Sequence, residues 1–206
     1  MKTFFVVEDH TVTNMGLVQL ITQKNGLECA GSAFSKSEAL EKISMLAVNG
    51  MDNLPDILIL DLFLGEDSGL DLLRQVRAEY PSIKVLVYSM YAKPGILSLV
   101  LEAGAHGFVE KSAPESVLIT AIKNILTGET FVQQNLVSPL FTYKTMFDGL
   151  TKQEQIVFKK ILERKSKTQI SEELNIISRS VDNYFTHIFE KTSCKNAQEV
   201  ISKFGE

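Results

Sequence analysis

The sequence predicts an α/β domain built on a five-stranded parallel sheet, followed by a small all-helical domain. In the first 127 residues, short apolar runs alternate with segments of helical spacing, whereas the last 58 residues show helical spacing alone. Alternating strands and helices are typical of a parallel sheet with helices on both faces. The charge shifts as well, since residues 1–127 hold 10 basic and 15 acidic residues and residues 149–206 hold 10 basic and 8 acidic ones. Such a shift favours two domains with different partners.

Five short apolar runs are the expected strands. Both faces of each run are apolar and β-branched residues recur in them, as in the buried strands of a parallel sheet. The runs are Thr3–Val7, Glu28–Ala33, Ile57–Leu60, Val85–Tyr88 and Gly107–Val109. Between and after the later runs, apolar residues recur at intervals of three and four, which predicts amphipathic helices. These residues include Leu70, Leu73 and Val76, then Ile96, Leu99 and Val100, then Val117, Ala121 and Ile125.

The C-terminal region shows the start signals of three helices. We expect residues 128–148 to be a linker with one short helix, between domains at 1–127 and 149–206. Two capping boxes follow, in which the first side chain and the one three residues later satisfy each other's backbone N–H groups. They are Thr151 with Glu154 and Ser166 with Gln169.

The second capped helix is expected to end at Leu174, with a tight break at Asn175. Ser178 is then expected to cap a third helix that reaches about Thr192. Two helices around a turn of three or four residues have the spacing of a helix-turn-helix.

Composition points to an ordinary globular protein of a reducing compartment. The chain is 45% hydrophobic and 22% charged, and its two cysteines, Cys29 and Cys194, lie far apart in sequence. Isolated cysteines suit the cytosol better than a disulfide framework. The apolar run in MKTFFVVED is too short for a signal peptide, and no run is long enough to cross a membrane. We therefore expect a cytoplasmic protein.

Polar residues follow four of the predicted strands at the same edge of the sheet. Glu8 and Asp9 end the first strand, Asp61 the third and Ser89 the fourth, and Lys111 follows the fifth. Ligand sites of parallel sheets lie beyond the carboxyl ends of their strands. Three carboxylates that converge there repel one another unless a cation joins them, and their hard oxygens suit Mg²⁺.

This arrangement fits phosphoryl transfer, which depends on positioning and charge neutralisation. Asp61 is the expected nucleophile, with Lys111 and Ser89 contacting phosphoryl oxygens. Each residue alone is more often a solvated loop residue or a helix cap, but their joint placement on four strand ends favours a site. The histidines lack metal-ligand spacing. For His10, beside the acidic pair, a place in the pocket and a loop role remain equally open.

The pattern EDH…PDILILDL…SGLDLLRQVR…VLVYSM…AGAHGFVEK resembles the receiver domain of response regulators over residues 1–127. The resemblance implies a flavodoxin-like fold, bound Mg²⁺ and phosphorylation by a sensor histidine kinase. It makes Asp61 the phospho-acceptor and Phe63 a metal ligand through its backbone carbonyl, and it makes Phe108 the aromatic residue of the switch. The remaining matches are Glu8 and Asp9 as metal ligands, Ser89 as the switch hydroxyl, and Lys111.

Three positions depart from this pattern. Glu8 stands where Asp is commoner, Gly65 where Pro is usual, and Ser68 where Asp is usual before Gly69. None of the departures removes a required group, so phosphorylation remains the expectation. The longer side chain of Glu8 could alter metal affinity.

Residues 149–202 resemble the LuxR-type domain of the NarL/FixJ regulators. The matching features include Leu150-Thr151 with Glu154, and Ser180-Val181 before Ile188. The resemblance implies a recognition helix at Arg179–Thr192 that enters the major groove of promoter DNA. We also expect phosphorylation of Asp61 to act through Ser89 and Phe108 on the surface of the fourth helix, fifth strand and fifth helix of the receiver, and to strengthen dimerisation.

The outward face of this helix is less basic than DNA binding by charge alone requires. Val181, Phe185 and Ile188 form its core face, and Asp182 stands where the family usually carries a base. Asn183 could read a base edge. The candidate DNA contacts are Lys165, Lys167, Arg179, Ser180, Asp182, Asn183, Thr186, His187 and Lys191.

Two functions from different classes remain open. The first is a transcription factor that phosphorylation switches, rather than a dedicated enzyme. The second, suggested by Asp182, is a receiver-based protein–protein adaptor with weak or lost DNA binding. A stand-alone phosphatase-like enzyme fits less well, because a single aspartate pocket with Ser89 and Lys111 suits self-phosphorylation better.

Overall fold

The computed structural model describes residues 1–48 and 50–205. Eight strands are described, namely β1 (Thr3–Val7), β2 (Glu28–Ala33), β3 (Ile57–Leu60), β4 (Phe63–Leu64), β5 (Asp67–Ser68), β6 (Lys84–Ser89), β7 (Gly107–Glu110) and β8 (Phe131–Val132). The α-helices are α1 (Thr11–Asn25), α2 (Lys36–Val48), α3 (Gly69–Glu79), α4 (Pro94–Glu102), α5 (Glu115–Leu126), α6 (Gln134–Asp148), α7 (Lys152–Leu162), α8 (Lys167–Leu174), α9 (Ser178–Thr192) and α10 (Ala197–Val200). A 3₁₀ turn at Met51–Asn53 and a π turn at Ile201–Gly205 complete the elements.

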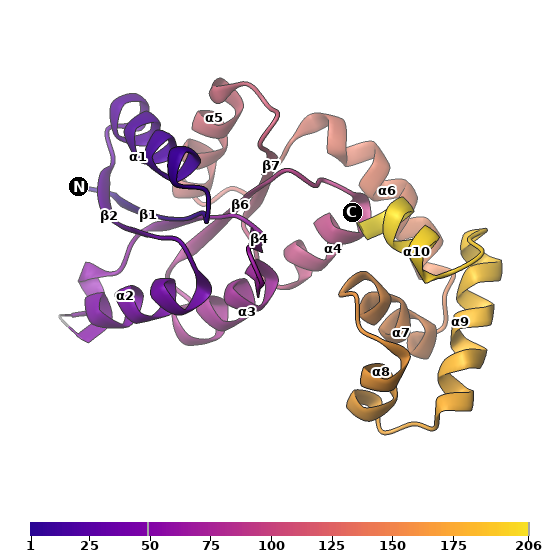
Figure 1. Cartoon of the computed structure of the whole chain (residues 1–206). Helices are drawn as coiled ribbons and strands as arrows, with labels where there is room; N and C mark the ends of the chain where they lie inside the picture. Colours follow the sequence, from indigo (N-terminus) through magenta and orange to yellow (C-terminus); the bar gives the residue numbers. More distant parts are fainter. Residues whose placement is uncertain (49, 206) are drawn as a thin grey trace. The chain divides into compact units, whose positions relative to one another are not determined.

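The chain divides into two compact units. The first comprises residues 1–90 and 100–133, and the second comprises residues 91–99 and 134 onward. The first unit holds a parallel sheet in the order β2-β1-β3-β6-β7-β8. Helices α1 and α5 cover one face of this sheet, and α2 and α3 cover the other (Figure 1).

All five predicted strands form, and the prediction of five strands falls short by one. The additional strand β8 pairs parallel to β7, with Gly107 opposite Phe131 and Phe108 opposite Val132. It is only two residues long and falls in the segment that was expected to be a linker, so no period-two pattern could mark it. The strands β6 and β7 also run further than predicted, to Ser89 and Glu110.

The interior of the sheet explains why its strands are apolar on both faces. Every residue of β3 is at most 1% exposed, because β1 and β6 flank this strand in the sheet and helices cover both faces. Phe4 and Val6 of β1 and Ile122 of α5 join the same buried cluster. This packed core holds the carboxyl ends of the strands in fixed positions.

A short hairpin and a close helix shape the backbone after β3. Strands β4 and β5 pair antiparallel, and Gly65 in the turn between them has a φ of 66°. Glycine adopts this left-handed conformation at little cost, whereas proline, whose φ is held at about −65°, cannot adopt it. At the start of α3, a Cβ on Gly69 would lie 2.3 Å from the carbonyl oxygen of Asp61. Only glycine lets α3 begin this close to Asp61.

The second unit is helical, and α6 corrects the expectation for residues 128–148. Instead of one short helix, the segment forms β8 and a 15-residue helix with Pro139 inside it. Tyr143 and Phe147 of α6 are nearly buried, and their rings lie 6.1 and 5.8 Å from that of Phe158. Tertiary packing of aromatic residues thus sustains a helix that its sequence signals too weakly.

Helices α8 and α9 form a helix-turn-helix with the predicted spacing. Both capping boxes are present, at Thr151 with Glu154 and at Ser166 with Gln169. The residue after α8, Asn175, has left-handed backbone angles and ends the helix. The prediction that Ser178 caps α9 is wrong, because Ser178 is the first helical residue and the preceding Ile177 makes no side-chain cap.

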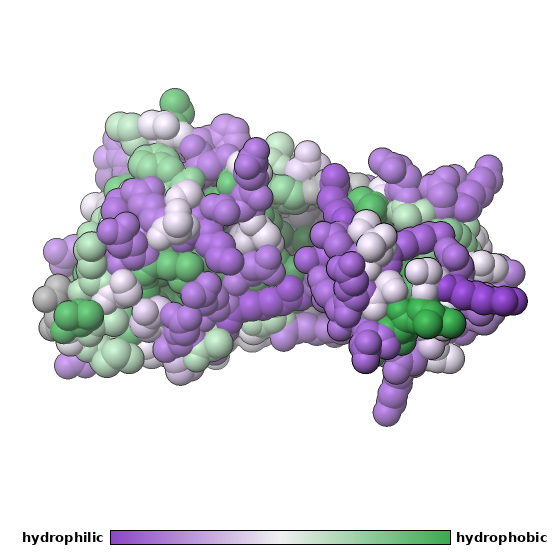
Figure 2. Space-filling view, turned by 60° about the horizontal axis from the view of Figure 1, so that its bottom comes forward, coloured by the Kyte–Doolittle hydropathy of each residue, from purple (hydrophilic) through white to green (hydrophobic). Residues whose placement is uncertain are grey.

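The surface is mixed, as is usual for a globular protein. Figure 2 shows that hydrophilic residues dominate the visible face and that hydrophobic residues occur among them in small patches. Within residues 1–48 and 50–205, no helix has the length and apolar character that crossing a bilayer demands.

Candidate functional site

The carboxylate of Asp61 lies at the end of β3 between two donors from neighbouring strands. The Ser89 hydroxyl donates to Oδ1 at 3.0 Å, and the Lys111 ammonium donates to Oδ2 at 2.6 Å. Asp61 is 5% exposed and Ser89 is fully buried. Backbone pairing of the Lys111 N–H with the Ser89 carbonyl, at 2.9 Å, holds the two donors side by side. The predicted convergence of these three side chains is therefore present.

Lys111 also joins Asp61 to Glu8. Its Nζ lies 2.6 Å from Glu8 Oε2, and only 11% of its side chain is exposed. Burial lowers the pKa of Lys111, but the hydrogen bonds and charges of Asp61 and Glu8 outweigh burial and leave the pKa above its ordinary value. Among the described residues, the ion pair with Lys111 is the one polar contact that the buried Glu8 Oε2 makes. One ammonium thus serves two buried carboxylates.

Glu8, Asp9 and His10 each offer one atom that could bind a metal ion, and these three atoms lie within 4.8 Å of one another. His10 Nδ1 lies 2.7 Å from Asp9 Oδ1 and 3.1 Å from Glu8 Oε1. Hydrogen bonding to Asp9, the charge of Asp9 and the same two interactions with Glu8 raise the pKa of His10. The His10 side chain is 74% exposed, so it contacts the acidic pair from the surface of the pocket. Asp61 is not part of this group and reaches Glu8 through Lys111.

The two phenylalanines of the expected site lie close in sequence to Lys111 and Asp61. Phe108 is fully buried on β7 and pairs in register with Val87 of β6, two residues before Ser89. Phe63 lies in β4, two residues after Asp61, and is partly buried. Both positions follow from the order of the strands.

Asn14 is a positioning residue that the sequence patterns did not single out. It lies on α1, is 1% exposed, and donates to the carbonyls of Glu8 and Ala33 at 3.0 and 3.1 Å. These bonds fix the backbone where β1 leaves the sheet and delivers the acidic pair. The sequence offers no clear signal for it, because apolar and polar residues of α1 are spread almost evenly around the helix.

The proposed DNA-binding face of α8 and α9 carries more ion pairs than its sequence suggested. Lys167, the first residue of α8, contacts Asp182 Oδ1 of α9 at 2.5 Å, and Lys165 contacts Glu173 at 3.3 Å. Arg179 is exposed and makes no ion pair within the described part of the chain. Exposed residues Asn183, Thr186 and His187 share the outer face of α9, and Ser180 is half-buried.

Lys191 is held by the buried carboxylate of Glu154. The Lys191 ammonium donates to Glu154 Oε2 at 2.7 Å, and the Thr151 backbone N–H donates to the same oxygen at 2.7 Å. His187 Nδ1 lies 3.6 Å from Oε1. Burial raises the pKa of Glu154, but the bonds from Lys191 and Thr151 outweigh burial and lower it overall. Lys165, Lys167 and Lys191, all candidate DNA contacts, therefore each have an acidic partner within this unit.

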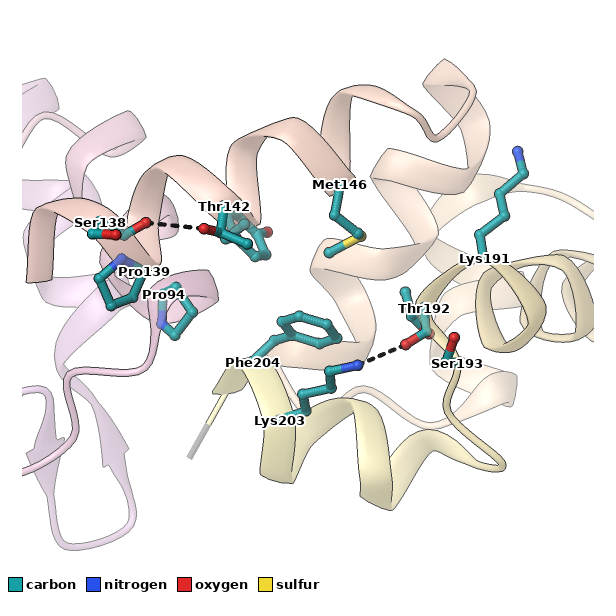
Figure 3. Close-up of a pocket in the computed structure, with 11 residues that line it drawn as sticks. Pro94, Ser138, Pro139, Thr142, Met146, Lys191, Thr192, Ser193, Lys203 and Phe204 are labelled. Carbon is teal, nitrogen blue, oxygen red and sulfur yellow. Dashed lines mark hydrogen bonds between the residues drawn. The ribbon is translucent and has the colours of Figure 1, made fainter.

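A cavity of about 600 Å³ lies beside the end of α9. Figure 3 shows the residues that line it. The Lys203 ammonium donates to the Thr192 carbonyl at 2.9 Å. A lysine at this place satisfies a carbonyl that the helix end leaves open. The rings of Phe204 and Tyr143 lie 5.9 Å apart in its wall. The cavity wall thus anchors the C-terminal end of α9.

Comparison with known families and curated proteins gives matches along nearly the whole chain. The family described as response regulator receiver domain matches residues 4–123, and the one described as bacterial regulatory proteins, luxR family, matches residues 148–204. The transcriptional activator protein ExaE of Pseudomonas putida is 28% identical over 205 residues, covering 95% of this chain and 92% of ExaE. The oxygen regulatory protein NreC of Staphylococcus aureus (strain JH9) is 28% identical over 209 residues, covering 95% of this chain and 93% of NreC.

Solved structures share the fold at lower identity. The RcsB response regulator of Salmonella typhimurium gives a TM-score of 0.68 at 20% identity, covering 98% of both chains. RcsB from Salmonella enterica serovar Typhimurium, bound to promoter rprA in the presence of the phosphomimetic BeF3-, gives 0.71 at 19% identity with the same coverage. These likenesses establish the fold.

Proposed function

The chain belongs to the response regulators of the NarL/FixJ type, and we propose that phosphorylation of Asp61 by a histidine kinase switches its binding to promoter DNA. The observation that carries the proposal is the carboxylate of Asp61, held between Ser89 Oγ and Lys111 Nζ. We assign the receiver to residues 1–127, the linker to 128–148 and the DNA-binding domain to 149–206, in a cytoplasmic protein.

The chemistry is a phosphoryl transfer to a carboxylate. An oxygen of Asp61 attacks phosphorus, a new O–P bond forms, and the bond to the donor breaks with its electron pair left on the departing group. Lys111 and Ser89 already bind the two oxygens of Asp61. They are therefore placed to shift their hydrogen bonds to the oxygens of the incoming phosphoryl group. The protein acts as a switch and not as a dedicated enzyme.

The residues around Asp61 suit Mg²⁺. The buried carboxylates of Glu8 and Asp61 share a single ammonium, that of Lys111, and the carboxylate of Asp9 lies beside Glu8. Hard carboxylate oxygens are the ligands that this ion prefers. Glu8, Asp9, Asp61 and the Phe63 carbonyl would hold it. When bound, Mg²⁺ would neutralise charge on the phosphoryl oxygens.

Switching is proposed to run from Asp61 to the surface through β6 and β7. A phosphoryl group offers new acceptors to the Ser89 hydroxyl, which now donates to Asp61 Oδ1. Movement of Ser89 leaves space that the buried ring of Phe108, on the neighbouring strand, can fill. Such a local charge and packing change can bias a two-state surface. The expected result is a homodimer, which suits a two-fold DNA site.

DNA docking is proposed to use the outer face of α9, with Asn183 toward base edges and Arg179 and nearby lysines toward phosphates. The alternative is an adaptor with weak DNA binding. One specific observation favours it, namely that Lys165, Lys167 and Lys191 each pair with an acid of the same unit.

The assignment of Asp61 is tested by incubating the whole protein with acetyl phosphate and Mg²⁺ and recording its intact mass. One phosphoryl group should be added to the wild type and none to Asp61→Asn. Asp71→Asn, which removes an exposed carboxylate from α3, is the matched control and should label like the wild type. Chelation of Mg²⁺ should suppress labelling. Full labelling of Asp61→Asn would refute the assignment.

A further inference from the structure

We propose that Asp182 restrains DNA binding by holding Lys167 in an intramolecular ion pair, for which the DNA phosphates must compete. The inference rests on the proposed DNA binding and assigns a regulator of affinity within the same face. Lys167 can therefore contact a DNA phosphate only while its ion pair with Asp182 is open.

The geometry that carries this inference joins the two helices of the helix-turn-helix. Lys167 is the first residue of α8, and its Nζ lies 2.5 Å from Asp182 Oδ1 on α9. The same ammonium lies 5.0 Å from the centre of the Phe185 ring. Asp182 and Phe185 of α9 therefore both contact the same ammonium group, that of Lys167.

The position of Lys167 is one that DNA phosphates approach. In a docked helix-turn-helix, the first helix crosses the DNA backbone while the second lies in the major groove. Free N–H groups at a helix start attract anions, and a lysine there adds a full charge. In this chain the carboxylate of Asp182 cancels that charge before any phosphate arrives.

Both side chains of the pair are more than half exposed, at 55% for Lys167 and 57% for Asp182. Water and salt therefore reach the pair, and its opening costs little. An exposed pair of this kind does not abolish DNA binding. While the pair is closed, Lys167 contacts no DNA phosphate, and DNA affinity depends on salt concentration as if there were one phosphate contact fewer.

The size of the effect follows from counterion release. Each phosphate that a lysine neutralises changes the slope of log K against log salt by about 0.9. At 0.1 M salt, one additional contact corresponds to about 8-fold tighter binding, since affinity varies as the salt concentration to that power. Opening the pair by mutation should produce a change of this order.

The test is a double-mutant cycle on the full-length chain with a short fluorescent DNA duplex of mixed sequence. No promoter is needed, because the contact is to phosphate and independent of sequence. Affinity is measured by anisotropy between about 50 and 200 mM salt, a range over which phosphate contacts are resolved. The proteins are wild type, Asp182→Asn, Lys167→Gln and the double variant. Glu190→Gln removes one exposed acid from the same helix and controls for net charge.

Asp182→Asn should bind the duplex about 8-fold more tightly than the wild type at 0.1 M salt, and its slope of log K against log salt should be steeper by about 0.9. Lys167→Gln alone should leave the slope of the wild type unchanged, and in the Asp182→Asn background it should remove the whole gain. Glu190→Gln should gain less than Asp182→Asn and leave the slope as it is.

Additive effects of the two substitutions would overturn the inference while leaving DNA binding intact, because Lys167 would then contact DNA regardless of Asp182. Tighter binding by Asp182→Asn with an unchanged slope would also overturn it, because the gain would then not come from an added phosphate contact. If none of the variants binds DNA, the proposed function fails together with the inference. Matching thermal unfolding curves would verify that all variants are folded.

Discussion

The Lys111–Asp61 pair of the sheet and the Lys167–Asp182 pair of the helix-turn-helix consist of the same groups, but the first is largely buried and the second is exposed to water. Side-chain exposure is 11% and 4% in the first pair and 55% and 57% in the second. Buried charges are costly unless partners compensate them, whereas exposed pairs contribute at most about 1 kcal/mol. The first pair is therefore required for a stable pocket, and the second can adjust affinity without endangering the fold.

Removal of the buried ammonium of Lys111 is expected to have the largest effect on stability. Lys111→Met leaves Glu8 and Asp61 without a cation, so the free energy of unfolding should fall by about 3 kcal/mol or more in the absence of Mg²⁺. Lys167→Met is the matched control and should cost less than about 1 kcal/mol. Urea unfolding with and without Mg²⁺ measures both. Equal losses in the two variants would contradict the contrast.

The pH dependence of this effect has a definite sign. The folded pKa of Lys111 is raised above the ordinary value of 10.5. A raised pKa means that the stabilisation by the ammonium is fully present below 10.5 and is lost as pH rises through the folded value. The cost of Lys111→Met should therefore be constant around neutral pH and shrink only in strong alkali.

The two pairs also differ in how well the sequence predicted them. Asp61, Ser89 and Lys111 each end or follow an apolar run, and a parallel sheet brings such ends to one edge. Lys167 and Asp182 lie 15 residues apart on two exposed helix faces. Their contact depends on how α8 and α9 pack, and no periodicity of either helix contains that information.

Other differences have equally local causes. Strand β8 is two residues long, too short for any alternating pattern, and α6 contains Pro139, which argues against a helix in sequence. Packing of Tyr143 and Phe147 overrides that signal. The cap of α9 failed as a prediction because Ser178 lies one position inside the helix. The longer strands and helices were thus predictable, while the two-residue strands, the boundaries and the contacts between helices were not.

The second unit also holds a buried carboxylate, that of Glu154. It is 3% exposed and accepts bonds from Lys191 and the Thr151 backbone. Glu154→Gln should lower the free energy of unfolding by about 2 kcal/mol at pH 7, since hydrogen bonds to charged groups are at stake. Glu172→Gln, at an exposed position on α8, should change little.

The pH dependence of the free energy of unfolding shows whether Glu154 stabilises the domain through its charge or through the shape of its side chain. The folded pKa of Glu154 lies below its ordinary 4.5. The stabilisation is therefore present above 4.5 and lost as pH falls through the folded value. Urea unfolding should show wild type and Glu154→Gln converging below pH 4.5. A difference that stays constant down to low pH would mean that the charge is not responsible.

The smallest expected effect is a gain in stability at the start of α9. Ile177 occupies the cap position, is 69% exposed and supplies no capping bond. Ile177→Ser should raise the free energy of unfolding of the DNA-binding domain by about 1 kcal/mol, because a serine oxygen can accept a free N–H. Ile177→Ala removes the same exposed side chain without adding a cap. Equal stability of the Ser and Ala variants would show that capping has no part in the gain.

The central claim, that the pocket at Asp61 governs binding of DNA by α9, is tested most directly by DNA affinity with and without acetyl phosphate and Mg²⁺. The full-length wild type should bind a mixed-sequence duplex more tightly and with a steeper salt dependence after treatment, because a dimer brings two sets of phosphate contacts. Asp61→Asn should show neither change. Identical affinities before and after phosphorylation of the wild type, or the same gain in Asp61→Asn, would contradict the account.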